Sequence, residues 1–393
     1  MFIARELSGL ERFGPVLDAL PRPAYLVGGT VRDLLLHLPP RFDFDLVVIG
    51  DAEAFARTLA ERLGGTVTTH GRFGTATVHY GDRAHVDVAT ARTESYAAPA
   101  ALPDVAAATT IDEDLRRRDF TINAMAVSLP DTELVDPFDG LRHLDERLIR
   151  VLHEQSFVDD PTRIFRGARY EARLHFRMDP KTETLALLAV PEVRRLSGAR
   201  VREELYAIFA EDEAPAALAR LHRFGVDEAL GMTFPDRSVL PALRALDAQY
   251  GLRFAPEHLG LLAIDAPAEK LDELKVERRL VRSTDAAHED AAALRDELAG
   301  TPSPAEIVDA VERTGPDTAL YALALGDHPA LRSYFERLRN VRLDLGGDDL
   351  AALGLAESPR VGEVLAELRR RKLNGELDGR AEELAAAREL IAE

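Results

Sequence analysis

The sequence contains no cysteine, which excludes disulfides and thiolate metal sites and fits a cytosolic protein. It also has no apolar run approaching the roughly 20 residues that a transmembrane helix needs. Residues 1–13, MFIARELSGLERF, do not contain the apolar core of a signal peptide. We therefore expect a cytoplasmic protein with no membrane partner.

Positive charge is in deficit as well, because 49 Lys and Arg stand against 68 Asp and Glu, for a formal net charge of −19. Contacts from Lys and Arg to phosphate supply most of the affinity of proteins for nucleic acids, so this total argues against such a partner. Binding depends on where the charges lie, however. Acidic residues crowd the C-terminal half, as in 285–297 and 382–393, whereas arginines gather in the middle of the chain. The net charge therefore does not exclude a nucleic-acid partner.

The stretch 25–48, YLVGGTVRDLLLHLPPRFDFDLVV, ends in a predicted strand that carries Asp43 and Asp45. Side chains of a strand alternate between its two faces, so residues two apart point the same way. Two carboxylates this close need a cation, and Mg²⁺ takes oxygen ligands from one or two carboxylates together with substrate phosphates. We therefore predict that Asp43 and Asp45 are catalytic and hold Mg²⁺, although such a pair alone is usually a solvated strand end.

The same stretch contains Gly28 and Gly29 just before a short predicted helix that carries Arg32. Glycine lets the backbone approach a ligand closely, and N–H groups that lead into a helix favour anions. An arginine one turn further on could grip phosphate through two hydrogen bonds. Together with the paired aspartates, this turn describes a site for a nucleoside triphosphate and its metal, although a Gly-Gly pair alone is usually only a turn.

The order of the Gly-Gly turn, the Arg-Asp pair and the Asp-x-Asp strand resembles the polymerase-beta-like nucleotidyltransferases. Within them it is similar to the bacterial-type (class II) tRNA nucleotidyltransferases and poly(A) polymerases, which carry a GGxVRD turn and a DxD strand. The resemblance implies an α+β fold, in which a head domain with a small mixed sheet and helices is followed by an all-α neck, body and tail. The corresponding boundaries are 1–138, 139–210, 211–330 and 331–393.

The pattern of the head region agrees with a small mixed sheet and helices on one side of it. It predicts an amphipathic helix over 1–24, a helix over 52–63, strands over 65–70, 75–80 and 84–90, and a mobile loop over 93–112. The strand 84–90 carries Asp87 among apolar neighbours. Polymerase-beta-like sites often take a third metal carboxylate from such a strand, so Asp87 is a candidate for it. The alternative is that Asp87 begins a polar loop or pairs with Arg92.

The segment 114–125, DLRRRDFTINAM, holds the densest signal of the chain. A run of arginines is most often a solvated patch. RRDFTINAM nevertheless resembles the second signature of the class II family nearly letter for letter, which implies that Arg118, Asp119 and Asn123 bind the sugar and triphosphate of the incoming nucleotide. Asp119 would hold the ribose hydroxyl. LVDPFDG at 134–140 matches the motif that closes the catalytic domain of that family.

A predicted helix follows in 156–178, with Asp160 as its N-cap and Pro161 at its first position. Arginines recur every three or four residues and form a basic stripe: Arg163, Arg166, Arg169, Arg173 and Arg177. Spacing alone favours arginines that pair with local acids. The resemblance points to an (E/D)DxxR motif that selects the incoming base, here Asp159, Asp160 and Arg163, with Arg166 and Arg169 also at the nucleotide and Arg173 and Arg177 at the tRNA.

From about residue 210 onward the sequence predicts helices separated by Pro and Gly. The tail resembles that of many tRNA nucleotidyltransferases and carries a group of cations, namely Arg360, Arg369, Arg370, Arg371 and Lys372. Arg360 lies at a predicted helix N-terminus and the others end that helix. They either complement the helix dipole or contact the backbone of the tRNA elbow.

The resemblance implies a template-independent tRNA nucleotidyltransferase that uses Mg²⁺, CTP and/or ATP and releases pyrophosphate. The form of 156–170 and of the loop before it looks closest to members that add C-C, so we expect addition of C residues, possibly of the full CCA end. The alternatives are an A-adding enzyme, a poly(A) polymerase, or an inactive RNA-binding scaffold. The expected partner is tRNA, contacted at its acceptor stem and elbow, and no DNA.

Overall fold

The computed structural model describes residues 13–38, 44–70, 74–82, 84–235 and 238–392. Asp43, one of the two predicted catalytic aspartates, lies outside these ranges. The chain divides into two compact units, one made of residues 1–204 with 211–230 and the other of 205–210 with 231–393. The finer domain boundaries expected from the sequence stay a prediction.

Within the described residues, the first unit contains a mixed sheet of seven strands in the order β3-β4-β5-β2-β1-β8-β9. The strands are β1 (Ala24–Val27), β2 (Phe44–Val48), β3 (Thr66–His70), β4 (Thr75–Tyr80), β5 (Ala84–Thr90), β8 (Ala126–Leu129) and β9 (Leu134–Val135). β2 and β5 run parallel, and the other neighbouring pairs are antiparallel. The small mixed sheet expected from the sequence is therefore confirmed, with β4 and β5 over the residues predicted for them.

One face of the sheet is apolar and is covered by α4 (Ala52–Leu63), the predicted helix. Alternate residues of β4 (Ala76, Val78 and Tyr80) are buried. So are Phe55 and Leu59 on the side of α4 that packs against the strand. The helix begins where the Asp51 side chain accepts a hydrogen bond from Ala54 N, and it ends at Gly64 in the left-handed conformation. Both ends of α4 are thus set by its own sequence.

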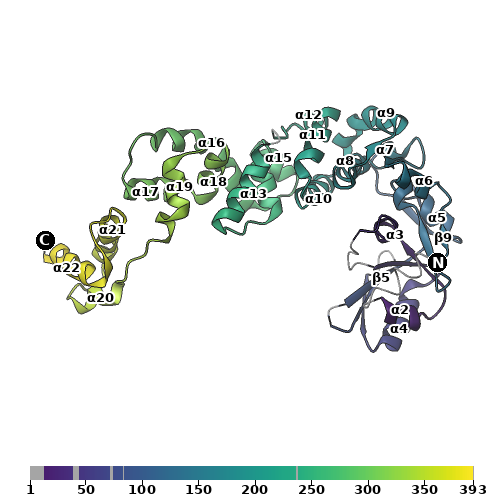
Figure 1. Ribbon diagram of the computed structural model, residues 1–393, viewed down its shortest axis with the longest axis horizontal. Coiled ribbons are helices and arrows are strands. Elements are labelled where there is room, and N and C mark those ends of the chain that lie inside the picture. Colours follow the sequence, from purple (N-terminus) through teal and green to yellow (C-terminus); the bar gives the residue numbers. More distant parts are fainter. Residues whose placement is uncertain (1–12, 39–43, 71–73, 83, 236–237, 393) are drawn as a thin grey trace. The chain divides into compact units, whose positions relative to one another are not determined.

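The helix predicted over 1–24 is shorter in its described part. It appears as α2 (Gly14–Ala19), which packs on α4 and lies with it on one side of the sheet (Figure 1). The chain leaves the helix at Leu20 and enters β1 after Pro23, because proline cannot continue a helical hydrogen-bond ladder. Residues 1–12 of the prediction lie outside the described ranges.

The prediction of a loop over 93–112 is wrong in part, because two short strands pair with each other in this region. β6 (Arg92–Ser95) and β7 (Asp104–Ala107) form an antiparallel ribbon, and α5 (Ile111–Arg116) follows. A capping box between Thr110 and Glu113 starts α5. The Ala- and Pro-rich segment shows no period of its own, so its sequence did not indicate that its two ends pair with each other.

The single helix start predicted at Asp160 is replaced by two helices, α7 (Ser156–Asp159) and α8 (Thr162–Leu174). Asp159 is the last residue of α7, Asp160 follows it as the C-cap, and Pro161 precedes α8. The predicted N-cap is therefore wrong by one residue, because α8 has Pro161 at its N-cap and no side-chain cap hydrogen bond. Oδ1 of Asp160 accepts a hydrogen bond from Thr162 N at 3.1 Å from just outside the helix. The stripe of α8 is not simply solvent-facing, since Arg163 is only 4% exposed.

The remaining elements of the first unit are short. They are α3 (Gly29–Leu35), η1 (Thr121–Asn123), α6 (Gly140–Asp145), β10 (Leu148–Ile149), β11 (Arg177–Met178), α9 (Pro180–Ala189), η2 (Val190–Arg195), α11 (Ala214–Phe224) and α12 (Val226–Leu230). α10 (Gly198–Phe209) begins in the first unit and ends in the second.

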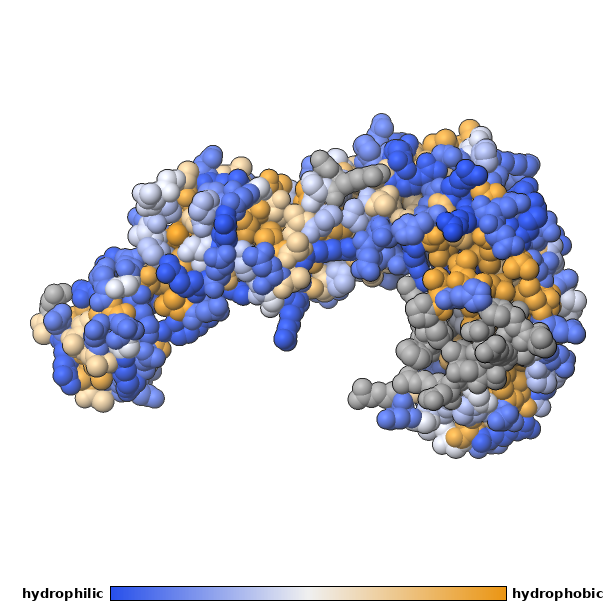
Figure 2. Space-filling view, in the orientation of Figure 1, coloured by the Kyte–Doolittle hydropathy of each residue, from blue (hydrophilic) through white to orange (hydrophobic). Residues whose placement is uncertain are grey.

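Helices make up the described elements of the second unit, as the sequence predicts. They are α13 (Val239–Tyr250), α14 (Pro256–Ala263), α15 (Ala268–Glu273), α16 (Arg278–Glu297), α17 (Pro304–Thr314), α18 (Pro316–Ala324), α19 (Pro329–Glu336), η3 (Leu338–Asn340), α20 (Gly347–Ala352), α21 (Pro359–Leu373) and α22 (Gly379–Ala392). The last three pack around Leu350, Leu368 and Ala387, while hydrophilic residues cover much of their visible face (Figure 2). None of the described helices is both long enough and apolar enough to cross a membrane.

Candidate active site

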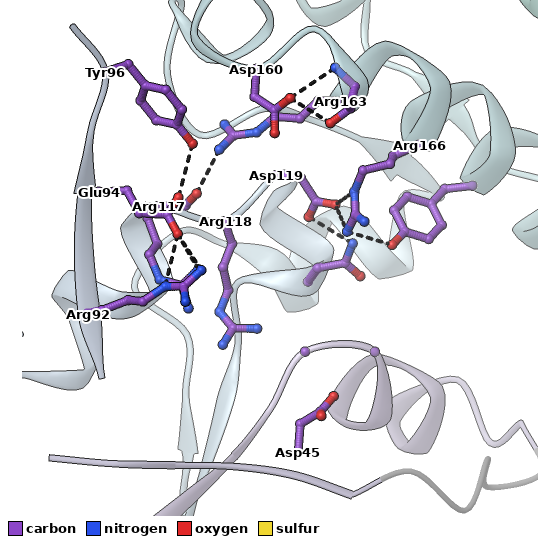
Figure 3. A pocket seen from close by; sticks show the side chains of 15 residues that line it. Asp45, Arg92, Glu94, Tyr96, Arg117, Arg118, Asp119, Asp160, Arg163 and Arg166 are labelled. Carbon is purple, nitrogen blue, oxygen red and sulfur yellow. Dashed lines mark hydrogen bonds and ion pairs between the residues drawn. The ribbon is translucent and has the colours of Figure 1, made fainter. Parts of the chain in front are cut away.

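A cavity of about 440 Å³ lies in the first unit, between the sheet and α8 (Figure 3). Many of the residues predicted for the nucleotide site line it: Gly28, Gly29, Asp45, Arg118, Asp119, Asn123, Asp160, Arg163 and Arg166. Other lining residues were not predicted, namely Arg92, Glu94, Tyr96, Arg117, Thr162 and Tyr170. The lining is therefore almost entirely polar and carries both signs of charge.

Gly28 forms the turn at the edge of this cavity, with a φ of 73° that favours glycine. A Cβ atom at Gly28 would lie 3.1 Å from Nη1 of Arg118. The predicted need for glycine here thus has two physical causes, the backbone conformation and the close approach of an arginine.

Arg32 lies behind the cavity and does not line it. The side chain is buried, its Nη1 donates to Oδ1 of Asn123 at 2.7 Å, and its Nε and Nη2 donate to Oδ1 of Asp33. In this structure the Arg32 guanidinium is therefore bound to Asp33 and Asn123 and does not point into the cavity, where we expected it to bind phosphate. Its guanidinium instead holds the lining residue Asn123 in place.

Asp119 is buried at the centre of a hydrogen-bond network. Its Oδ2 accepts from Nε and Nη2 of Arg166 at 2.8 and 2.6 Å, and its Oδ1 accepts from Phe120 N and from Asn123 Nδ2. Burial opposes ionisation, but Arg166 and these hydrogen bonds outweigh it and lower the pKa of Asp119 to about 2. The carboxylate is thus charged and fixed in orientation at neutral pH.

A second buried carboxylate, Asp114, organises the arginine run. It accepts hydrogen bonds from Nη2 of both Arg117 and Arg118 at 2.9 Å. Burial raises the pKa of Asp114, yet the two guanidinium groups lower it further than burial raises it. The run predicted as either a solvated patch or a ligand site is therefore held by an internal acid on one side and faces the cavity on the other.

One wall of the cavity, formed by Arg92, Glu94 and Tyr96, is not predicted from the sequence. Glu94 accepts from Arg92, from Arg117 and from the Tyr96 hydroxyl, the last at 3.0 Å. Burial, with a contribution from Glu94, raises the pKa of Tyr96 to about 12. Their spacing carries a signal, because residues two apart in sequence face one side of a strand, whereas the Ala- and Pro-rich residues that follow favour a loop.

Asp160 and Arg163 face the cavity from the start of α8, and each is held by the protein on one side only. Oδ1 of Asp160 accepts from Thr162 and from Nη2 of Arg200, the latter at 2.6 Å, while Oδ2 has no hydrogen-bond donor among the described residues. Arg163 donates from Nη1 to Ser156 Oγ and from Nη2 to the carbonyl oxygen of Arg117. These contacts leave Oδ2 of Asp160 as an acceptor and the remaining N–H groups of Arg163 as donors, both facing the cavity.

Asp159 does not join this pair. It lines a neighbouring cavity of about 390 Å³, where its Oδ2 lies 4.0 Å from Nδ1 of His153. Asp159 ends α7 and Asp160 lies in the connection to α8, so the two consecutive carboxylates point into different spaces.

Glu204, on α10, is a third carboxylate near these arginines, half-buried as a residue but with its Oε2 atom buried. Its Oε2 has no hydrogen-bond partner among the described residues. Burial raises the pKa of Glu204, against the opposing influence of Arg166 and Arg169. Arg169 does not line the cavity and donates to Glu211 at 3.3 Å, and Arg173 pairs with Asp33 and Glu211.

Asp45 and Asp87 lie side by side on the two parallel strands β2 and β5, paired in register. Both line a cavity of about 450 Å³ on the sheet, and Asp45 also lines the cavity at α8 (Figure 3). Two oxygen-donor side chains on one face suit a hard divalent cation. No group of three His, Cys, Asp or Glu side chains is placed for a metal within the described ranges, from which Asp43 is missing.

The predicted tRNA-binding cations of the tail are engaged with the protein itself. Arg360 lies in the first turn of α21, as predicted, and donates to the carbonyl oxygen of Leu390. The others pair with acids: Arg369 with Glu312, Arg370 and Arg371 with Glu367, and Lys372 with Asp344 and Glu383. Arg177, by contrast, is exposed and has no acidic partner among the described residues.

Comparisons with known families match two parts of the chain. Residues 24–150 match the poly A polymerase head domain. Residues 175–230 match a model described as the probable RNA and SrmB-binding site of polymerase A.

Three curated relatives show how far the similarity extends. An A-adding tRNA nucleotidyltransferase of Halalkalibacterium halodurans is 34% identical over 98% of this chain and 92% of its own. One from Geobacter sulfurreducens is 34% identical over 96% of this chain, which spans only 46% of that protein. A CC-adding tRNA nucleotidyltransferase of Deinococcus radiodurans is also 34% identical, over 92% of this chain and 88% of its own.

Solved structures agree with these relatives. A CCA-adding enzyme in complex with CTP superposes with a TM-score of 0.81 at 30% identity, covering 100% of this chain and 98% of that one. The Thermotoga maritima CCA-adding enzyme in complex with tRNA gives a TM-score of 0.78 at 30% identity, with the same coverage. The chain is therefore an enzyme that belongs to the tRNA nucleotidyltransferase family, which comprises A-adding, CC-adding and CCA-adding members.

Proposed function

We propose that this enzyme adds nucleotides to the 3′ end of tRNA without a nucleic-acid template. The observation that carries the proposal is the pair Asp160 and Arg163, a fixed acceptor beside fixed donors in a polar cavity. Protein side chains can then select the base that a template strand would otherwise select.

The donor and acceptor pattern of this pair suits C and A. Both bases carry an exocyclic amine that donates next to a ring nitrogen that accepts, so the free oxygen of Asp160 receives the amine and Arg163 donates to the ring. Uracil and guanine reverse this order and would leave buried polar groups unpaired, at a cost of roughly 1–3 kcal/mol. Because Ser156 and Arg200 fix the two side chains from behind, the discrimination does not depend on mobile groups.

The triphosphate and sugar would occupy the side of the cavity formed by the Gly28–Gly29 turn and the arginine run. Arg118 is the cation that faces this turn most closely, and Asn123 is held by Arg32. Arg166 fixes Asp119 so that its carboxylate can accept the ribose hydroxyl. The 3′ oxygen of the RNA attacks the α-phosphate and pyrophosphate leaves, and most of the acceleration comes from alignment and charge neutralisation.

Mg²⁺ fits the oxygen donors that the sheet presents. Asp45 and Asp87 would hold it, together with Asp43, which lies outside the described residues. When bound, the metal supplies charge neutralisation at the phosphates and lowers the pKa of the attacking hydroxyl. The role of these side chains is to offer anionic oxygens on one face, next to the cavity that takes the nucleotide.

C is the nucleotide that we propose for transfer, because the form of 156–170 and of the loop 96–103 resembles that of CC-adding members. Addition of A is the second candidate, and the match to an A-adding relative over 98% of this chain favours it. Full CCA addition would use both bases at the same pair. Poly(A) synthesis is a further candidate, since residues 24–150 match the poly A polymerase head domain.

One assay separates these candidates. The enzyme is incubated with Mg²⁺ and tRNA that ends either at the discriminator base or at C-C, with labelled CTP or ATP. Two C and no A on the shorter tRNA is the expected result, A alone on the C-C substrate would establish A addition, and both steps would establish a CCA enzyme. Long A tails on unrelated RNA would point to poly(A) synthesis, and no incorporation would favour a binding scaffold.

The Asp45→Asn variant is the control for this assay. It preserves the size of the side chain and removes its charge, so we expect incorporation to fall about 100-fold or more, while tRNA binding, measured by filter retention, stays near the wild-type level. Incorporation that survives the substitution would contradict the assignment of Asp45 as a catalytic residue.

A further inference from the structure

A row of polar side chains crosses the sheet from β2 to β3. Asp45 pairs in register with Asp87, Asp87 with Thr77, and Thr77 with Thr68. Residues paired in register on neighbouring strands point to the same face. The polar row lies on the face opposite α4. Its neighbours along each strand point to the other face, and one of them, Val78 on β4, is buried there.

Thr77 makes the shortest contact in this row. Its Oγ1 donates a hydrogen bond to Oδ1 of Asp87 at 2.6 Å, and Nε2 of His70 lies 3.4 Å from the same Oγ1. A hydroxyl has a single hydrogen, which Thr77 gives to Asp87, so Nε2 of His70 acts as the donor. Oδ2 of Asp87 has no donor among the described residues and remains for a ligand in the cavity that Asp87 shares with Asp45.

We propose that Thr77 is a positioning residue for the nucleotidyl transfer, acting through Asp87, and that His70 in turn fixes the direction of the Thr77 hydroxyl. The inference rests on the proposed function, which makes Asp45 and Asp87 the carboxylates that meet the divalent cation. Neither Thr77 nor His70 touches substrate in this assignment.

The physical reason is the rotational freedom of the Asp87 side chain, which is only half-buried on β5. Without a partner, the Asp87 carboxylate can rotate among its rotamers, and its two oxygens exchange roles. A hydrogen bond from a hydroxyl to a charged oxygen is short and strong, so it selects one orientation. Partners of this kind behind a metal ligand typically contribute about 10- to 100-fold in affinity or activity.

A purely structural role for Thr77 makes a different prediction. Valine has nearly the same shape as threonine and is at least as favourable in a strand. If Thr77 only completes the sheet, Thr77→Val leaves both stability and activity unchanged. The two interpretations therefore predict different activities for the Thr77→Val enzyme, a large loss in one case and no change in the other.

The test compares Thr77→Val with two matched variants. Thr77→Ser keeps the hydroxyl, and Thr68→Val makes the same change on the same face at a residue whose Oγ1 contacts His79 and not Asp87. We expect Thr77→Val to lower kcat about 10- to 100-fold with little change in the KM for CTP. Thr77→Ser and Thr68→Val should keep most of the activity, and equal thermal unfolding temperatures for all three would exclude misfolding.

A double mutant shows whether Thr77 acts through Asp87. In an Asp87→Ala background the Thr77→Val change should have no further effect, because the group that it orients is gone. Losses that multiply would overturn the proposal. So would a Thr77→Val enzyme with wild-type kcat.

Metal binding provides a readout that does not depend on turnover. Mn²⁺ binding in the presence of CTP is followed by the electron paramagnetic resonance signal of the free ion, and Thr77→Val should weaken it about 10-fold or more while Thr68→Val does not. A wild-type enzyme without incorporation would overturn the proposed function. Mn²⁺ binding would still decide on Thr77, since equal affinities in all variants would overturn its positioning role.

Discussion

Glu204 has a carboxyl group in a place that disfavours its ionised form. Its pKa is raised by burial, which means that the folded protein binds a proton at this carboxyl more tightly than the unfolded chain does. The stability from that preference is present below the unfolded pKa and is lost as the pH rises through the folded pKa. Above the raised pKa of Glu204, its ionised form therefore opposes folding.

We expect Glu204→Gln to unfold at a higher temperature than the wild type at pH 8, because it removes the buried charge. The difference should shrink toward pH 4, where the wild-type carboxyl is also neutral. Circular dichroism melts across this range measure the effect, and Glu203→Gln is the control, since Glu203 is exposed and pairs with Arg202 at the surface. A Glu204→Gln enzyme that is less stable at pH 8 would show that Arg166 and Arg169 need this charge.

The sequence identified the residues of this region better than it identified their contacts. The match of the arginine segment to a known signature named Asp119 and Asn123, and both line the cavity. That Asp119 binds Arg166, 47 residues later, follows only from the packing of α8 beside η1. Arg32 shows the same limit, because a motif tells which residue occurs and not whether it faces the ligand or supports a residue that does.

Helix α8 carries both Arg163 and Arg166, and its position depends on Gly167. A Cβ atom at Gly167 would lie 2.3 Å from Cε of Met178 and 3.2 Å from Cζ of Phe120. Met178 and Phe120 are buried, so they have little room to give way. Gly167 thus lets α8 approach the segment that precedes Asn123.

The Gly167→Ala substitution should lower stability by about 1–3 kcal/mol through overpacking. It should also lower activity by up to about 100-fold, because a shift of α8 misplaces both arginines. Denaturant unfolding and the incorporation assay measure the two effects. Gly362→Ala in α21 is the control, since no atom lies within 4 Å of its added Cβ, and it should leave activity unchanged and stabilise by up to about 1 kcal/mol.

Elements with a clear period were predicted well, and elements that depend on distant pairing were not. The alternation of β4 and β5 and the caps of α4 lie within their own sequence, so their bounds follow from it. β6 and β7 exist because residues such as Arg92 and Ala107 pair with each other. Their Ala- and Pro-rich connection carries no such information.

The net charge of −19 does not show which Lys and Arg side chains are paired with acids and which are not. In the tail, the arginines and the lysine that could meet RNA are already paired with acids, most of them at the surface. Arg177 lies in a segment similar to a probable RNA-binding domain and is exposed without an acidic partner among the described residues. An unpaired arginine can neutralise a phosphate without first losing an ion pair.

We therefore expect Arg177→Ala to weaken tRNA binding and to reduce the slope of log Kd against log salt concentration by about 1. Arg370→Ala, which removes a cation held by Glu367, should change both quantities less. Filter binding at several salt concentrations provides the measurement. The reverse order of the two variants would place the RNA backbone at the tail.

The parallel register of β2 and β5 determines which changes in chain length the site can tolerate. The turns that join the elements between Asp45 and Asp87 can gain or lose residues without altering which side chains oppose each other across the two strands. A deletion of one residue between Asp45 and the end of β2 would turn Asp45 over relative to the rest of the strand. Its side chain would then lie beneath α4, on the face that carries the buried Val78 and Leu59. Insertions and deletions accepted during evolution should therefore cluster at the turns and avoid these two strands.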